Sequence, residues 1–197
     1  MSTLTVNTGS MFSGKSTLLI SQGEKHAKAG QRVLFVKPAI DSRYSESEVV
    51  THGGLRVQAL SLDISTALSS VIKPYEYDVV LIDEIQFFNK RICAGMWWLL
   101  SQGVVVYASG LDLNYLGDGF ETMNEVLAMA DKVNKLKGIC GKCGKDSVLT
   151  GKKSFIEAEE DSGNIIDLGS EDKYIPLCRS CWFKFMTSGG NISPEIW

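Results

Sequence analysis

The stretch that decides the fold is GSMFSGKST, residues 9–17, which follows a short apolar run. Gly9, Gly14, Lys15 and Ser16 match the spacing G-x-x-x-x-G-K-[ST] of a phosphate-binding loop. In such a loop backbone N–H groups face the phosphates of a nucleotide, the lysine meets the β and γ oxygens, and the hydroxyl reaches Mg²⁺. The stretch lies between an expected strand and an expected helix, so it predicts a nucleoside triphosphate site rather than a glycine-rich turn.

The remaining pattern predicts an α/β fold. Short apolar runs typical of buried parallel strands begin at residues 4, 32, 78 and 104. Amphipathic stretches, which predict helices, cover residues 15–30, 89–103 and 120–132. Alternation of strand and helix favours right-handed βαβ units with helices on both faces of the sheet. We therefore expect a RecA-like P-loop domain over residues 1–136.

The run DVVLIDE, residues 78–84, predicts the second half of the site. A buried strand here would deliver Asp83 beside the phosphate loop, where its carboxylate can hold Mg²⁺ directly or through water. Glu84 is the adjacent carboxylate and could accept a proton from an attacking hydroxyl. The alternative is that both acids merely end a strand at the surface.

Residues 137–197 have a different composition, rich in Gly, Lys, Asp and Ser, and contain two C-x-x-C pairs. Four thiolates are the ligand set of a closed structural Zn²⁺ site, whereas free thiols or a redox pair are the alternatives. The long gap between the pairs predicts a substantial loop held at its base. The pairs are Cys140 with Cys143 and Cys178 with Cys181.

Composition limits the class of protein. With 44% hydrophobic residues the chain can bury a proper core, and a net charge of −3 argues against a protein that mainly grips nucleic acid. No targeting segment or membrane-spanning run is evident, which together with the cysteine pairs predicts a cytoplasmic protein. We expect Cys93 to be a small buried apolar residue, His26 to be solvated, and Trp97 and Trp98 to lie in the core or a subunit interface.

Taken together, these residues resemble the thymidine kinases of the phosphate-loop type that carry a zinc lid. The resemblance covers nearly the whole chain and keeps the order of the family. The matching stretches are GSMFSGKST, VKPAIDSRY, VVTHGG, LIDEIQFF, SGLDLNY, KCGKDSVLTGK and EDKYIPLCRSC.

The resemblance implies transfer of the γ-phosphate of ATP to the 5′-hydroxyl of thymidine, with deoxyuridine as a possible second acceptor. It implies that Glu84 is the base, that Arg43 contacts the hydroxyl and the transferred phosphate, and that Asp41 and Asp83 belong to the Mg²⁺ shell. Lys15 would neutralise the phosphates. The residues implied in the ATP-binding loop are Gly9, Ser10, Met11, Phe12, Ser13, Gly14, Lys15, Ser16 and Thr17.

For the nucleoside, the resemblance implies apolar walls from Met11, Phe87 and Tyr115. It further implies that Thr150 and Tyr174 lie on a lasso loop, within residues 137–197, that zinc staples over the base. Core packing is the alternative for Met11 and Phe87. A homotetramer and inhibition by thymidine triphosphate are also implied.

Two other functions stay open. A zinc-lidded nucleoside monophosphate kinase would need several extra arginines to bind its acceptor phosphate, whereas the arginines of this chain are scattered along the sequence. An ATP-driven nucleic-acid-binding protein would want a basic zinc ribbon, but residues 137–197 carry more acidic than basic side chains.

Overall fold

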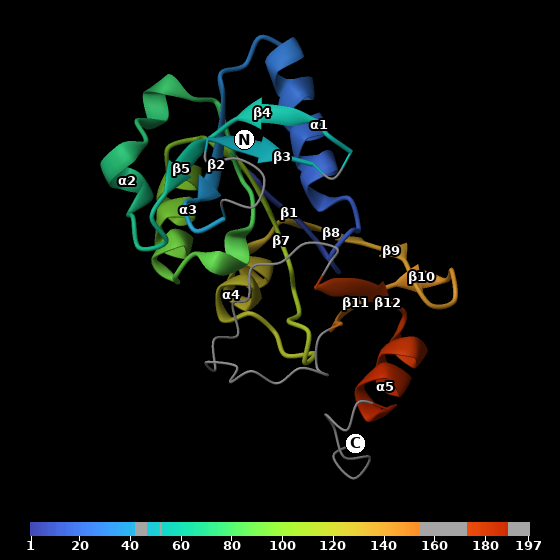
Figure 1. Cartoon of the computed structure of the whole chain (residues 1–197). Helices are drawn as coiled ribbons and strands as arrows, with labels where there is room; N and C mark the ends of the chain where they lie inside the picture. The colour runs from blue at the N-terminus through green and yellow to red at the C-terminus, as the bar shows by residue number, and fades with distance from the viewer. Residues whose placement is uncertain (42–46, 52, 154–172, 189–197) are drawn as a thin grey trace.

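A six-stranded parallel sheet, in the order β5-β2-β6-β7-β1-β8, forms the centre of the molecule (Figure 1). The computed structural model describes residues 1–41, 47–51, 53–153 and 173–188. The predicted parallel α/β sheet is confirmed, and all the predicted strands lie in it. Its strands are β1 (Leu4–Gly9), β2 (Val33–Pro38), β5 (Leu60–Leu62), β6 (Val79–Ile82), β7 (Val105–Gly110) and β8 (Lys132–Leu136).

Side-chain alternation along the central strands explains how the sheet is buried on both faces. In β6 the side chains of Val79 and Leu81 join one core cluster, which includes Leu19 of the first helix. Val80 and Ile82 join the other cluster, on the opposite face. Because both faces of β6 are fully buried, this strand reads as a continuous apolar run in the sequence.

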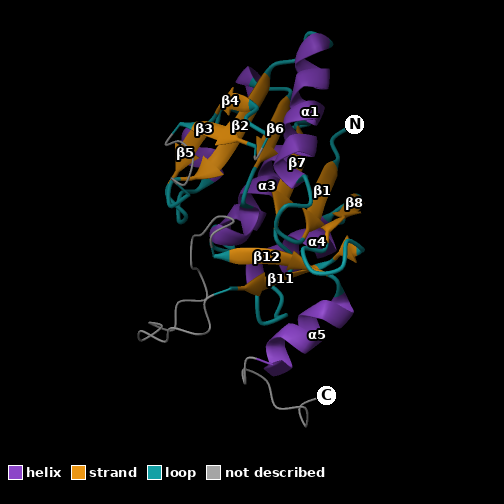
Figure 2. Ribbon diagram, turned by 45° about the vertical axis from the view of Figure 1, so that its right-hand side comes forward, coloured by secondary structure: helices purple, strands orange, loops and turns teal. Residues whose placement is uncertain are grey.

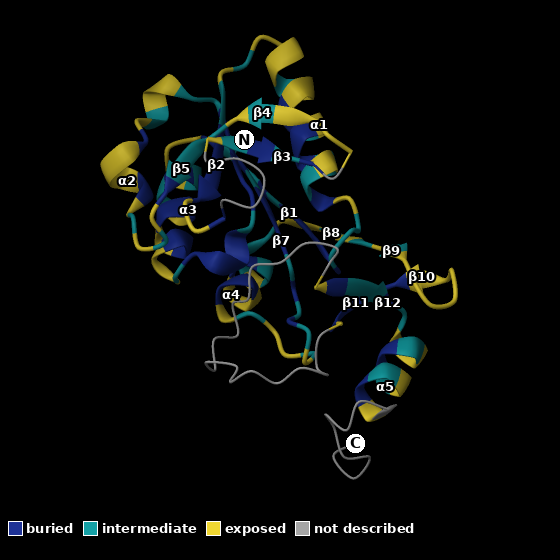
Figure 3. Ribbon diagram, in the orientation of Figure 1, coloured by how far each residue is buried: buried dark blue, intermediate teal, exposed yellow. Residues whose placement is uncertain are grey.

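Helices cover the two faces of the sheet, as predicted. Helix α1 (Lys15–Lys28) contacts one face, while α3 (Arg91–Ser101) and α4 (Glu121–Met129) pack on the other (Figure 2). The third predicted helix ends earlier than expected, because the chain enters β8 at Lys132. The shorter helical turns are α2 (Leu68–Val71), η1 (Pro74–Glu76) and η2 (Ile85–Phe87). Buried residues concentrate in the strands and on the sheet-facing sides of the helices (Figure 3).

Small antiparallel elements complete the described chain. The hairpin β3 (Glu48–Val50) and β4 (Arg56–Gln58) lies beside β2. Beyond β8, β9 (Gly138–Ile139) pairs with β10 (Asp146–Ser147), and β11 (Leu149–Lys152) pairs with β12 (Tyr174–Leu177). Helix α5 (Arg179–Ser188) follows β12. This part has its own core cluster around Trp182, and its division from residues 1–136 as a separate domain stays a prediction.

Single-residue expectations had mixed outcomes. Cys93 is buried, as predicted, and burial raises the pKa of its thiol to about 11. The expectation for His26 was wrong, because its ring is half-buried and its Nε2 lies 2.9 Å from the Tyr107 hydroxyl. Trp98 packs against the main core, whereas Trp97 is 57% exposed. Among the described helices, none has both the length and the apolar character needed to cross a membrane.

Candidate active site

The phosphate loop connects β1 to α1 and has a backbone that needs its glycines. Gly9 has φ +141° and Gly14 has φ +84°, values that L side chains rarely adopt. A Cβ on Gly9 would lie 2.2 Å from the carbonyl oxygen of Leu136 in the neighbouring strand. Phe12 also has a positive φ, +62°, as often found where a loop is shaped for function. The sequence motif therefore corresponds to a tightly wound loop at the carboxyl edge of the sheet.

Lys15 lies across the loop that precedes it. The side chain is buried, and its Nζ donates a hydrogen bond of 2.8 Å to the carbonyl oxygen of Ser10. The ammonium group is thereby held at the mouth of the loop, beside the amino end of α1, where an anion is favoured. This is the position predicted for a lysine that meets nucleotide phosphates.

Asp83 follows β6 directly and is buried beside the loop. Burial, followed by the charge of Glu84, raises the pKa of Asp83 to about 6, although a hydrogen bond from the Ser16 hydroxyl opposes the rise. A divalent cation here would stabilise the charged carboxylate. Ser16 and Asp83 thus meet, as the motif predicts for a shared Mg²⁺ site.

Glu84 is held in an unusual backbone conformation at the start of η2. Its φ of +49° and ψ of +43° place it in the left-handed region, which costs a residue with a side chain about 1 kcal/mol or more. Its Oε2 accepts a hydrogen bond from Nε2 of the buried Gln86. The turn therefore directs two successive carboxylates differently, with Asp83 buried and Glu84 half-exposed in the cleft.

One cleft brings nine of the predicted site residues together. Predicted members that line it are Met11, Phe12, Gly14, Lys15, Ser16, Thr17, Asp41, Asp83 and Glu84. Members that sequence reasoning did not name are Lys37, Glu48, Val49, Val50, Thr51 and Leu111. The sequence does contain an indication for Lys37, because a lysine inside an otherwise apolar strand is rarely buried unless its charge is paired.

Other predicted residues lie elsewhere in the described chain. Phe87 and Tyr174 are buried, and neither lines the cleft. Lys152 Nζ lies 5.1 Å from the centre of the Tyr115 ring, a cation–π contact. Thr150 contacts the phosphate loop, as described below. Arg43 lies outside the described residues.

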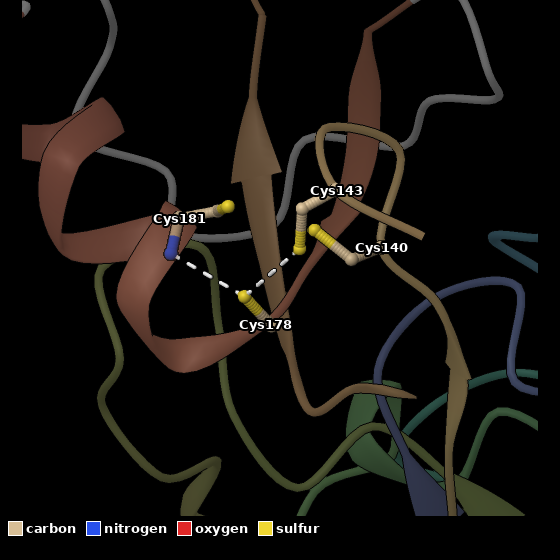
Figure 4. Close-up of side chains that lie close together, drawn as sticks. All are labelled: Cys140, Cys143, Cys178 and Cys181. Carbon is tan, nitrogen blue, oxygen red and sulfur yellow. Dashed lines mark hydrogen bonds between the residues drawn. The ribbon is translucent and has the colours of Figure 1, made fainter. Parts of the chain in front are cut away.

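The predicted cysteine pairs converge. Cys140 and Cys143 flank a turn between β9 and β10, and Cys178 and Cys181 lie at the start of α5, with the four sulfur atoms directed toward a common centre (Figure 4). All four Sγ atoms lie within 4.8 Å of one another, and those of Cys143 and Cys178 are 3.6 Å apart. Four sulfurs at about 2.3 Å from a tetrahedral Zn²⁺ would show spacings of this size.

The chemistry of the thiols also fits a cation. Burial opposes ionisation of Cys140, but backbone hydrogen bonds from Cys178, Lys142 and Cys143 outweigh it and lower the pKa to about 6. Side-chain hydrogen bonds with Cys178 and Cys143 raise the pKa of Cys181 to about 12. All four thiols can be ionised together only if a cation lies among them. The cluster is therefore compatible with zinc.

Hydrogen bonds join the cysteine-bearing part to the phosphate loop. The hydroxyl of Thr150, on β11, accepts a bond of 3.1 Å from the backbone N–H of Met11. The Ser147 hydroxyl, on β10, lies 3.1 Å from that of Ser10, and both residues are buried. Trp182 of α5 donates from Nε1 to the carbonyl oxygen of Thr150 at 3.2 Å. The strands beside the cysteines thus contact the loop directly.

The fold and this cleft define a P-loop nucleotide-binding protein, and a kinase with this fold uses ATP with Mg²⁺. A model of the thymidine kinase family matches residues 2–182. The chain is also 35% identical over 182 residues to the thymidine kinase of Pseudothermotoga lettingae, covering 92% of this chain and 95% of the relative. The chain belongs to the thymidine kinase family, whose activity is the phosphorylation of thymidine. The resemblance inferred from the sequence is confirmed.

Similar solved structures are more distant. They include the replication initiator DnaA bound to AMPPCP and single-stranded DNA, with 15% identity and a TM-score of 0.43, and the Pif1 helicase from Candida albicans, with 14% and 0.39. These matches cover 68% and 69% of this chain, but only 40% and 36% of those chains. Similarity at this level carries no argument about function.

Proposed function

We propose that this chain transfers the γ-phosphoryl group of ATP to the 5′-hydroxyl of thymidine, giving thymidine monophosphate and ADP for pyrimidine deoxynucleoside salvage. Deoxyuridine would be a second acceptor. The observation that carries the proposal is the meeting, in one cleft of a thymidine kinase family member, of Lys15, Asp83 and Glu84. These supply a cation for the phosphates, a carboxylate for Mg²⁺ and a base for the hydroxyl.

The phosphate loop would hold the nucleotide. Its backbone N–H groups and the amino end of α1 would face the triphosphate, and Lys15 would exchange its bond to the Ser10 carbonyl oxygen for phosphate oxygens. Arg43, which lies outside the described residues, would contact the 5′-hydroxyl and the transferred group. In-line attack then depends mainly on positioning and charge neutralisation.

The metal ligands would be Ser16 and Asp83, which touch, together with Asp41, which lines the same cleft. Bound Mg²⁺ supplies neutralisation of the charge that develops on the β and γ oxygens. The raised pKa of Asp83 supports this assignment, since a carboxylate buried beside a second acid favours a cation.

Glu84 would act on the acceptor. Its carboxylate would take the proton of the 5′-hydroxyl as the O5′–P bond forms and the bond from the γ-phosphorus to the leaving oxygen of ADP breaks. The turn that holds Glu84 in the left-handed region supports this role, because it separates the base from the metal-binding Asp83.

The C-terminal part would enclose the nucleoside. Cys140, Cys143, Cys178 and Cys181 would hold a structural Zn²⁺ that fixes the base of the lasso. Thymine would lie against Met11, Phe87 and Tyr115, with Thr150 and Tyr174 contributing from the lasso. The bond from Met11 to Thr150 supports the closeness of lasso and loop.

Three finer statements rest on the resemblance. We propose that the chain forms a homotetramer, that thymidine triphosphate inhibits it, and that it acts in the cytoplasm. Thymidine triphosphate carries both the acceptor base and a triphosphate, so it could occupy both halves of the site. The cysteine cluster, suited to a reducing compartment, supports the location.

The test is a phosphoryl-transfer assay with ATP and Mg²⁺, presenting thymidine, deoxyuridine, deoxycytidine and thymidine monophosphate separately. The proposal expects transfer to thymidine, with deoxyuridine second and the monophosphate unreactive. If thymidine monophosphate alone accepts phosphate, the chain is a nucleotide kinase. ATP hydrolysis without any acceptor would refute the proposal and direct attention to nucleic acid.

A further inference from the structure

Gln86 occupies a buried position between two strand ends of the active site. It belongs to η2, two residues after Glu84, and its side chain is 5% exposed. Its Nε2 donates to Oε2 of Glu84, and its Oε1 accepts from the backbone N–H of Leu111 at 3.0 Å. The amide therefore bridges Glu84, after β6, to the residue that follows β7.

The two partners fix which way the amide points. The N–H of Leu111 can only donate, and an ionised carboxylate can only accept, so oxygen must face Leu111 and nitrogen must face Glu84. Gly110 makes room for this arrangement, because a Cβ there would lie 2.3 Å from Oε1 of Gln86. The amide is thus held by the sheet and is itself in position to hold the glutamate.

The Glu84 side chain requires a partner that fixes the orientation of its carboxylate. Its backbone adopts the left-handed region in the turn between β6 and η2, outside any regular element. A long carboxylate side chain loses rotamer freedom when it is held in one geometry. The Gln86 amide is fixed by the backbone N–H of Leu111, which follows β7. Its hydrogen bond would order the Glu84 carboxylate before the substrate binds, so that this rotamer entropy is already lost.

We propose that Gln86 is a positioning residue for phosphoryl transfer, orienting the Glu84 carboxylate toward the acceptor hydroxyl through a side-chain hydrogen bond anchored on the Leu111 N–H. The inference rests on the proposed function, in which Glu84 is the base. Gln86 does not line the cleft among the residues that the structure describes, so it acts on the substrate through Glu84.

The experiment compares steady-state kinetics of Gln86→Met, Glu84→Gln and the double variant with the wild-type protein. Met keeps the length of the side chain but offers no amide. We expect Gln86→Met to lower kcat about 10- to 100-fold, the effect of losing one hydrogen bond to a charged group, with KM for ATP and thymidine within about threefold. In the Glu84→Gln background the same change should have almost no further effect on kcat.

A matched control is Gln22→Met. Gln22 also exchanges side-chain amide hydrogen bonds, with Asn7, but it lies on α1 and is not among the residues that line the cleft with Glu84. We expect it to lower the melting temperature while leaving kcat within about twofold of wild type. This control separates a loss of stability from a loss of positioning.

The outcomes are distinguishable. A folded Gln86→Met protein with wild-type kcat, or an equal loss in the Glu84→Gln background, overturns the role of Gln86 while leaving that of Glu84. Wild-type kcat in Glu84→Gln overturns both. If Gln86→Met does not fold, Gln86→Leu replaces it, since its side chain likewise offers no donor to Glu84; wild-type kcat in that folded variant also overturns the inference.

Discussion

Replacing Gly110 with alanine should test how closely the end of β7 approaches the turn that carries Glu84. The added Cβ would lie 2.3 Å from Oε1 of Gln86 and 2.9 Å from both Ile85 Cγ2 and Met123 Cε. Gly110 has no positive φ, so the backbone itself accepts alanine. The perturbation is therefore one of packing at a buried site.

The size of the effect follows from these contacts. A carbon and an oxygen in contact normally lie more than 3 Å apart, so the amide of Gln86 must move by about 1 Å. Such a shift breaks its hydrogen bonds to Glu84 and to Leu111. Overpacking of this kind costs about 1–3 kcal/mol, which for a chain of this size lowers the melting temperature by roughly 2–12 °C.

The assay combines thermal unfolding with kcat for thymidine phosphorylation. We expect Gly110→Ala to be less stable and to lose about 10- to 100-fold in kcat, as expected when the hydrogen bond to the Glu84 carboxylate is lost. Adding Gln86→Ala should relieve the overlap and recover part of the stability without recovering kcat. Unchanged stability and kcat in Gly110→Ala would refute the reasoning, as would recovery of kcat in the double variant.

Further predictions concern other contacts. Thr150→Val keeps the side-chain shape but removes the acceptor for the Met11 N–H. The Kd for ATP with Mg²⁺, measured by calorimetry, should therefore rise about 2- to 10-fold. An unchanged Kd would exclude coupling through this hydrogen bond. Hydrogen bonds from Arg32 lower the pKa of Asp78 from 3.8 to about 2. Its stabilisation is therefore complete above about pH 4 and lost as the pH falls through 2, so Asp78→Asn should flatten that part of the melting-temperature profile, whereas an unaltered profile would contradict the linkage. Cys143→Ala should remove bound zinc, measured by elemental analysis, and weaken thymidine binding more than ATP binding; equal losses would argue against a nucleoside lid.

The sequence predicted the centre of the fold because central parallel strands are apolar on both faces. All four residues of β6 are buried, and such runs are plain in a sequence. The edge strands were missed for the opposite reason. β5 has three residues, and β8, with sequence KVNKL, is largely exposed, so neither shows a continuous apolar pattern.

The site was predicted where chemistry depends on local spacing and missed where it depends on distant partners. The phosphate loop and the cysteine pairs are short motifs, whereas the position of Gln86 depends on Leu111, which follows β7 and is distant in the sequence. His26 was expected to be solvated because its neighbours in the sequence are charged, but its partner Tyr107 lies on β7. Contacts of this kind arise only when the sheet assembles.

The most direct test of the central claim is single-turnover phosphorylation of thymidine by Glu84→Gln, with thymidine and ATP binding measured on the same protein. If the Glu84 carboxylate takes the proton of the 5′-hydroxyl, the rate should fall by about 10²–10⁴-fold while both dissociation constants stay near those of wild type. A wild-type rate with intact binding would contradict the claim and remove Glu84 from its role.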